Sequence, residues 1–462
     1  FSNGGPGESD FLSNGVRQKN ISDMDMTFSN MDWNVDYKKT SKKEGEEFSI
    51  SAQLSTGRTP QRFSNTFIPQ GASTGTTTER NNTSKNNEYT VQTDYTYPFS
   101  KSTTLEVGAK GIFREIRSQF DFSSQDFDYN QDVAAAYGVI NFNLTKKLKF
   151  KGGLRAEYTD ISFAGGPAKN NYFNLFPSVV LSQNLKGGST IKVSYNRRVQ
   201  RPSLFYLNPF RNEANQFSVF QGNPDLDPEL SHNVELGYST FIKGSMINAS
   251  LFYRNTRRVI ENIIQPDVSG KTLTTYANVG TTQSFGANLF GSYNPTPKWT
   301  LMSNIGVNTY EINRQAGDLQ GMNEGTYLNY NFFMRSATAF KGGWNLELFG
   351  VVSSPRYTYQ SKTQAMLFYG GAVKKDIMKK QGTIGLNLLN PFKRDLHIET
   401  ETMAGGTRQT QNIYYPLRQI GLNFSYKFGK LKFTEKKKIK NDDVKQEQQQ
   451  GGGMGGGMGQ GK

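Results

Sequence analysis

The residues whose types and spacing could do chemistry are concentrated between Arg197 and Glu229. Arg197, Arg198 and Arg201 follow one another closely, and a fixed cluster of guanidinium groups suits a carboxylate or phosphate ligand. The alternative is that these arginines are interfacial or lumen charges paired with Glu229 or Glu235. The sequence leaves both interpretations open.

Acidic residues alternate with other residues near the end of the same stretch. Asp225, Asp227 and Glu229 offer oxygen atoms of the kind that bind calcium. Prolines stand beside them in the pattern of a surface turn, which favours a solvated loop over a metal site. We therefore predict no bound metal.

The residue types present in the chain give little support for nucleophilic catalysis. The chain has no cysteine and only two histidines, His232 and His397. A serine or aspartate mechanism needs a histidine held by a carboxylate beside an activated hydroxyl, and no spacing around either histidine indicates such a set. The basic residues form no recognisable nucleic-acid module. We predict neither an enzyme, nor a cofactor, nor a nucleic-acid partner.

Aromatic residues in the connection from 201 to 229 alternate with Asn, Gln and Arg. Rings offer stacking surfaces and amides offer hydrogen bonds, which together suit a ligand site. Prolines at both ends should hold the loop in shape and reduce the entropy lost on binding. We expect this loop to fold over or into a lumen. The candidate contact residues are Phe205, Tyr206, Phe210, Phe217 and Phe220.

Long strands must position these residues, because apolar and polar side chains alternate over ten or more positions from about residue 28 to residue 428. One face of the last such segment carries Ile420, Leu422, Phe424 and Tyr426, and the other carries Gly421, Asn423 and Ser425. The same alternation separates Leu328, Tyr330 and Phe332 from Asn329 and Asn331. Strands with one apolar and one polar face can cross a membrane as part of a barrel. The predicted fold class is all-β, a large antiparallel transmembrane β-barrel.

Short turns rich in Lys, Gly and Pro alternate with long loops along the chain. Bacterial outer-membrane barrels show this asymmetry, with short periplasmic turns and longer extracellular loops. About eight short turns join about sixteen strands, and a final strand makes about seventeen, whereas a closed barrel normally needs an even number. We expect the chain to start inside a barrel whose wall closes, if at all, only with residues 1–22.

Three segments are predicted along the chain. Residues 1–27 form an N-terminal loop or partial strand, and residues 28–428 form the barrel. Residues 429–462 begin with a basic run and continue into Gln-rich and Gly-rich sequence, which cannot bury enough apolar surface to order itself. We expect this last segment to be a flexible tail in the periplasm.

Two motifs carry a family resemblance. An arginine and a proline close the strand that ends near residue 200, and Gly-Asn-Pro-Asp-Leu-Asp-Pro-Glu opens the next strand from residue 222. In these motifs the sequence resembles TonB-dependent outer-membrane receptors, in particular the barrel family common in Bacteroidota. The signature residues are Arg201, Pro202, Asn208, Pro209, Gly222, Asn223, Pro224, Leu226, Pro228 and Glu229. They can shape the rim, since prolines fix φ and remove donors, or contact a substrate directly.

The resemblance implies a barrel of about 22 strands, filled by an N-terminal plug domain and energised through an inner-membrane complex. No plug is recognisable in this sequence. The chain is therefore expected to be either about the C-terminal seventeen strands of such a receptor or a divergent barrel.

The function that the resemblance implies is uptake of a bulky nutrient across the bacterial outer membrane. Long extracellular loops and a polar lumen would bind the nutrient. The alternative is a non-transporting barrel that scaffolds a surface or assembly complex. The expected partners are outer-membrane lipid and a surface lipoprotein or other outer-membrane subunits, with the TonB machinery only if the full precursor carries a plug.

Overall fold

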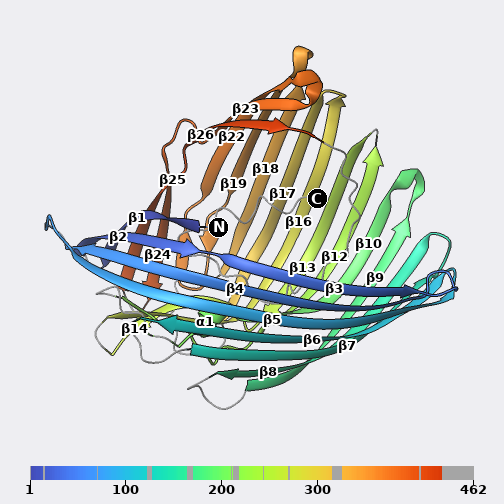
Figure 1. The fold of residues 1–462 in the computed structure, drawn as a ribbon, viewed down its shortest axis with the longest axis horizontal. Helices are drawn as coiled ribbons and strands as arrows, with labels where there is room; N and C mark the ends of the chain where they lie inside the picture. Colours follow the sequence, from blue (N-terminus) through green and yellow to red (C-terminus); the bar gives the residue numbers. More distant parts are fainter. Residues whose placement is uncertain are drawn as a thin grey trace.

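A single curved wall of antiparallel strands makes up most of the molecule in the computed structural model (Figure 1). The structure describes residues 2–13, 16–69, 71–121, 127–163, 170–209, 211, 218–242, 244–268, 271–314, 325–404 and 407–428. The main sheet contains 23 strand segments, which amount to 17–18 wall strands because several segments continue one another. The fold class predicted from the alternation of side chains is confirmed.

The wall strands follow one another around the sheet, mostly in chain order. Their segments are β1 (Ser2–Ser13), β2 (Val16–Thr27), β3 (Ser29–Thr40), β4 (Glu47–Ile68), β5 (Thr76–Ser100), β6 (Thr103–Phe120), β7 (Phe127–Asn143), β8 (Leu148–Phe163), β9 (Asn170–Asn184), β10 (Thr190–Gln200), β12 (Glu229–Ile242), β13 (Ser245–Arg257), β16 (Gly280–Thr296), β17 (Trp299–Arg314), β18 (Gly325–Ala339), β19 (Trp344–Ser353), β22 (Met366–Ile377), β23 (Gly382–Leu389) and β26 (Gln419–Tyr426). β2 and β3 pair with successive parts of β4 and count as one wall strand. Residues 1–27, for which the sequence predicts a loop or a partial strand, hold β1 and β2.

The long connections contain short elements of their own. These are α1 (Leu204–Leu207), β11 (Ser218–Phe220), β14 (Ile260–Pro266), β15 (Thr272–Asn278), β20 (Arg356–Tyr357), β21 (Ser361–Thr363), β24 (Asp395–Ala404) and β25 (Thr407–Pro416). On the opposite rim the connections are tight, and three of them are 3-10 turns at Lys186–Gly188, Lys341–Gly343 and Met378–Lys380. Gly187 and Gly342 have φ of 75° and 73°, which a residue with a Cβ rarely adopts. The glycines of the first two turns follow from that geometry, whereas in the third turn Lys379 adopts a φ of 53° without a glycine.

The wall does not close into a complete ring. β1 pairs with β2 along its whole length and with β25 over Ser9–Ser13, which joins the two ends of the sheet near the long loops. Toward the short turns, β3 pairs with β4 and β26 pairs with β23, and no further partner of either strand occurs within the described ranges. The edges of β3 and β26 therefore remain open.

Side chains on the wall alternate between two surfaces. On β18, Leu328 and Phe332 are exposed on the outer surface, while Arg335 faces the inside and pairs with Glu347 of β19. The outer surface of β26 is apolar as well, with Ile420 and Leu422 largely exposed. Among the described residues no helix has the length and apolarity that crossing a membrane requires.

Candidate functional site

The stretch that the sequence singles out folds into a small layer at the long-loop end of the wall. β11 pairs in parallel with β15, and β15 pairs antiparallel with β14, so that α1, β11, β14 and β15 form one unit. We call these four elements the mouth assembly. Figure 1 shows α1 and β14 at the lower left, at the far end of the wall strands from the turn between β22 and β23.

The mouth assembly packs on the inner face of the wall. Tyr206 and Leu207 of α1 are buried in one cluster with Tyr129 of β7 and Ile161 of β8. Tyr158, on the alternate face of β8, is exposed on the outer surface. Because neighbouring residues of a strand point to opposite faces, the cluster lies on the lumen side, where the loop is expected to fold.

Arg201 is the most deeply buried charged residue of the signature, with 1% of its surface exposed. Its Nη2 lies 2.7 Å from Oε2 of Glu157 and 3.0 Å from Oγ1 of Thr159. Arg155 also contacts the Glu157 carboxylate. Arg201 thus pairs with Glu157, a partner that the sequence did not indicate, because the chain turns inward at residue 201 and reaches back to β8.

The three neighbouring arginines do not form one cluster. Arg197 lies on the same face of β10 as Val193, which is exposed on the outer surface, whereas Arg198 lies on the inner face and donates from Nε to Oδ1 of Asn196. Arg201 is beyond the strand and buried. The alternation of the strand thus divides groups that are adjacent in sequence.

Gly222 is required by the close approach of two backbone segments. Its N–H donates to the Asn208 carbonyl at 2.9 Å, and the next N–H, of Asn223, donates to the Tyr206 carbonyl at 2.6 Å. A Cβ at position 222 would stand 2.4 Å from the Asn208 oxygen and 2.8 Å from the Tyr206 oxygen. Only glycine fits there without moving the backbone.

Asn223 connects the signature to the mouth assembly. Its Nδ2 donates to the Tyr276 carbonyl at 3.0 Å, and its Oδ1 accepts the N–H of Asp225 at 2.9 Å, which closes an Asx turn. Leu226, three residues further on, is buried in the same cluster as Tyr206. Pro202 and Pro228 are also buried. These residues hold the loop in its position on the wall.

The acidic residues of this stretch contact residues between 258 and 278 of the same chain. Asn278 accepts the N–H of Asp227 at 2.9 Å and donates to its carbonyl at 3.0 Å, and the Asp227 carboxylate lies 3.4 Å from Arg258. Glu229 accepts the N–H of Ile260 at 2.7 Å. Within the described part of the chain, no group of three or more His, Cys, Asp or Glu side chains is arranged to hold a metal ion. The backbone of Asp227 and the carboxylate of Glu229 therefore hold the loop against residues 260 and 278.

The candidate aromatic residues have different environments. Phe205 is 43% exposed and stacks on Phe220, with ring centroids 4.7 Å apart. Tyr206 is buried and stacks on Tyr276 at 4.0 Å. Two further candidates, Phe210 and Phe217, lie outside the described residues. Phe205 and Phe220 therefore form the accessible part of the aromatic stack. Pro209, beside it, accepts a hydrogen bond from Gln221 through its carbonyl, and Pro224 is half-buried.

Sequence reasoning missed Tyr276, which lies in the middle of the stack. Its ring is 6.2 Å from Phe205 and 6.1 Å from Phe220, with both rings edge-on to it. Tyr276 belongs to β15, a strand inside a long connection and more than 45 residues from the signature. Alternation in the segment 272–278 could have predicted the strand, but no local signal predicts its partner.

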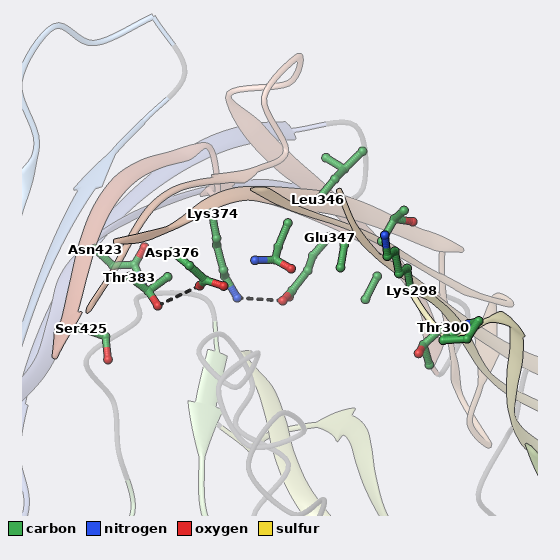
Figure 2. A pocket seen from close by; sticks show the side chains of 14 residues that line it. Lys298, Thr300, Leu346, Glu347, Lys374, Asp376, Thr383, Asn423 and Ser425 are labelled. Atoms are coloured by element: carbon green, nitrogen blue, oxygen red, sulfur yellow. Dashed lines mark hydrogen bonds and ion pairs between the residues drawn. The ribbon is translucent and has the colours of Figure 1, made fainter. Parts of the chain in front are cut away.

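A second polar group faces the lumen near the short turns (Figure 2). Glu347 of β19 accepts from Lys374 of β22 at 2.9 Å and pairs with Arg335 of β18 at 3.0 Å. The cavity beside them has a volume of about 570 Å³ and extends to Thr383 and Asn423. Sequence reasoning did not select these residues, although Lys and Glu at inward positions of apolar strands are a signal that could have done so.

The chain belongs to a family of outer-membrane β-barrels. The family described as "Outer membrane protein beta-barrel family" matches residues 39–426, which is most of the chain. The protein is therefore an integral outer-membrane barrel. No curated protein matches the chain in sequence.

Solved structures share the fold at low sequence identity. The copper transporter OprC is 12% identical, with a TM-score of 0.55 over 89% of this chain and 80% of its own. The siderophore receptor PirA from Pseudomonas aeruginosa has the same identity and coverage and a TM-score of 0.52. The ferric yersiniabactin uptake receptor FyuA from Yersinia pestis is 12% identical, with a TM-score of 0.52 over 92% of this chain and 80% of its own.

Proposed function

We propose that this barrel is an outer-membrane receptor and transporter of the TonB-dependent type, which takes up a bulky nutrient. The observation that supports this most directly is the mouth assembly. The chain folds its signature loop onto the inner face of the wall and leaves the Phe205 and Phe220 rings at the long-loop end. Copper, siderophore and ferric-chelate transport by the proteins of similar fold supports the same class of function.

In this proposal the nutrient first contacts the aromatic stack. Stacked rings bind apolar or ring-shaped groups at low entropic cost, because Asn223 and Gly222 fix the loop that carries them. The polar lumen, with Glu347 and Lys374, then offers hydrogen bonds to a hydrated solute. A plug domain in the full precursor would gate this path through the TonB machinery. The tail 429–462 would extend into the periplasm, and a surface lipoprotein could cover the mouth.

The proposal is tested by uptake in the native host. Strains that carry the full gene, a deletion, or the Phe205→Ala variant would be supplied in turn with ferric chelates, oligosaccharides and peptides as limiting nutrients. We expect the deletion to abolish growth on one class, and the variant to slow uptake of that class by roughly tenfold through loss of one stacking contact. An uncoupler that removes the proton-motive force should stop uptake.

The matched control is Phe241→Ala, an exposed aromatic residue at the short-turn end of β12. Its uptake should equal that of the wild type. If the deletion strain grows normally on every nutrient class while a stable surface complex loses its subunits, the scaffold function would replace transport.

A further inference from the structure

Two arginines on the outer surface of the barrel stand just above its apolar band. Arg197 lies on β10 two alternate positions beyond Val193, and Arg257 lies on β13 three alternate positions beyond Leu251. Val193 and Leu251 are 45% and 59% exposed, which identifies the outer face. Both arginines lie toward the long-loop ends of their strands, so they are at the extracellular side of the membrane.

The two arginines lie on either side of His232, on the two strands that flank β12. His232 of β12 is the direct cross-strand partner of Arg197, and Arg257 pairs with the residue two positions before His232, on the same face. Diagonal neighbours on one face of a sheet are within reach of long side chains. The Tyr195 hydroxyl lies 2.9 Å from Nδ1 of His232, which places an aromatic residue between the arginines and the aliphatic band below.

Two other outward arginines at this end of the wall pair with acids. Arg62 contacts Glu79 at 3.2 Å, and Arg117 contacts Asp128 at 2.6 Å. Arg197 and Arg257 form no ion pair in the part of the chain that the structure describes, and Arg197 donates to the Leu175 carbonyl at 3.2 Å. The Nε of Arg197 is buried and has no hydrogen-bond partner among the described atoms. Within the described ranges, this positive charge at the membrane interface therefore has no ion-pair partner.

We propose that Arg197 and Arg257 bind a phosphate group on the headgroup of an anionic lipid in the outer leaflet. A guanidinium offers a rigid pair of donors that matches phosphate, and the low polarity of the adjacent band strengthens the attraction. The acyl chains of the same lipid lie against Val193, Val234 and Leu251, which are exposed directly below. The site rests on the outer-membrane placement of the barrel and deepens the proposed lipid contact. It is independent of which nutrient is carried.

The test uses the full chain, purified in a neutral detergent and mixed with diphosphoryl lipid A, phosphatidylcholine or inorganic phosphate. Native mass spectrometry counts bound lipid. We expect Arg197→Gln with Arg257→Gln to weaken lipid A binding at least about tenfold. The control, Arg62→Gln with Arg117→Gln, removes the same charge from the same rim and should retain binding within about twofold. Phosphatidylcholine should bind all variants equally and weakly.

Arg197→Lys with Arg257→Lys keeps the charge but loses the paired donors, so its binding should fall between that of the wild type and that of the Gln variant. Heat-sensitive migration on gels confirms that each variant is folded. Equal binding by the wild type and the Gln variant would overturn the proposal. So would an equal loss in the Arg62 and Arg117 control, which would indicate an effect of net charge, or competition by inorganic phosphate at millimolar concentration, which would indicate a free-anion site. The lipid-binding experiment does not depend on nutrient uptake, so a failure of the lipid site can be distinguished from a failure of transport.

Discussion

The inner face of the wall is buried at the long-loop ends of β7 and β8, where apolar side chains surround the Glu157–Arg201 ion pair, but it is open and charged near the short turns of β19 and β22. Tyr129 and Ile161 are buried under the mouth assembly in the first region. Glu347 and Lys374 form an ion pair beside an open cavity in the second region. The outer residues are apolar in both regions, for example Leu154 and Leu348.

The difference shows that the polarity of the inward side chains depends on whether another part of the chain covers them. Where the chain supplies its own cover, as α1 does over Tyr129, apolar side chains can face inward because they leave water. Where no part of the described chain covers the wall, inward positions stay polar, as at Glu347. Inward apolar side chains such as Tyr129 and Ile161 therefore mark the part of the lumen that a loop covers.

The largest effect is expected from Arg201→Ala. The variant leaves the Glu157 carboxylate buried, with Arg155 as its remaining partner, and should destabilise the mouth assembly by about 3–5 kcal/mol. Hydrogen exchange should speed up in residues 204–209 and 218–229 but not in β19 and β22. Adding Glu157→Gln should restore part of the loss. Unchanged exchange in the mouth assembly of Arg201→Ala would contradict the role of the ion pair.

Lysine substitutions on the outer surface test whether the β7–β8 region and the β19–β22 region have the same apolar outer face and differ only in the polarity of their inner faces. Leu154→Lys and Leu348→Lys should each cost about 2–4 kcal/mol in lipid vesicles, because both side chains face the bilayer. The inward control Asn345→Lys, beside the cavity, should cost much less. Guanidinium titration of the refolded protein measures the free energy of unfolding. Equal costs for Asn345→Lys and Leu348→Lys would reverse the assignment of faces on β19.

A smaller and more local effect is expected from Gly222→Ala. The added methyl group would overlap the Asn208 and Tyr206 carbonyl oxygens and should cost about 1–3 kcal/mol. We expect faster proteolysis within residues 204–229 while the strands stay protected. Gly421→Ala serves as the control, because nothing lies within 4 Å of a Cβ there. Equal proteolysis of both variants would show that the close approach at Gly222 does not hold the loop.

The smallest effect is expected from Glu347→Gln. Its carboxylate is partly exposed to the cavity, so the loss of the contacts with Arg335 and Lys374 should cost about 1 kcal/mol or less. Glu157→Gln, which removes a buried charge beside Arg201, should cost more. The two unfolding free energies, measured by the same titration, would sharpen the contrast between the covered and the open region. If Glu347→Gln lowered the free energy of unfolding more than Glu157→Gln, the expected order of the covered and the open region would be reversed.

The sequence by itself determined the wall. A period of two fixes which side chains share a face, so the alternation at 328–332 and 420–426 was enough to predict strands, their outer surface and a count of about seventeen. Turn chemistry was equally local, because Gly187 and Gly342 adopt a positive φ that other residues avoid. Strand alternation and turn conformation depend only on residues that are close in sequence, so a single sequence is enough to predict them.

The tertiary structure alone decided the partners within the lumen. Arg201 meets Glu157 from 44 residues away, and Tyr206 stacks on Tyr276 from a strand further along. Which carboxylate or ring comes within contact depends on how the loop folds back across β9 and β8, since side chains at such separations carry no spacing signal. The same folding decided that Tyr206 and Arg201 are buried and that Phe205 is exposed.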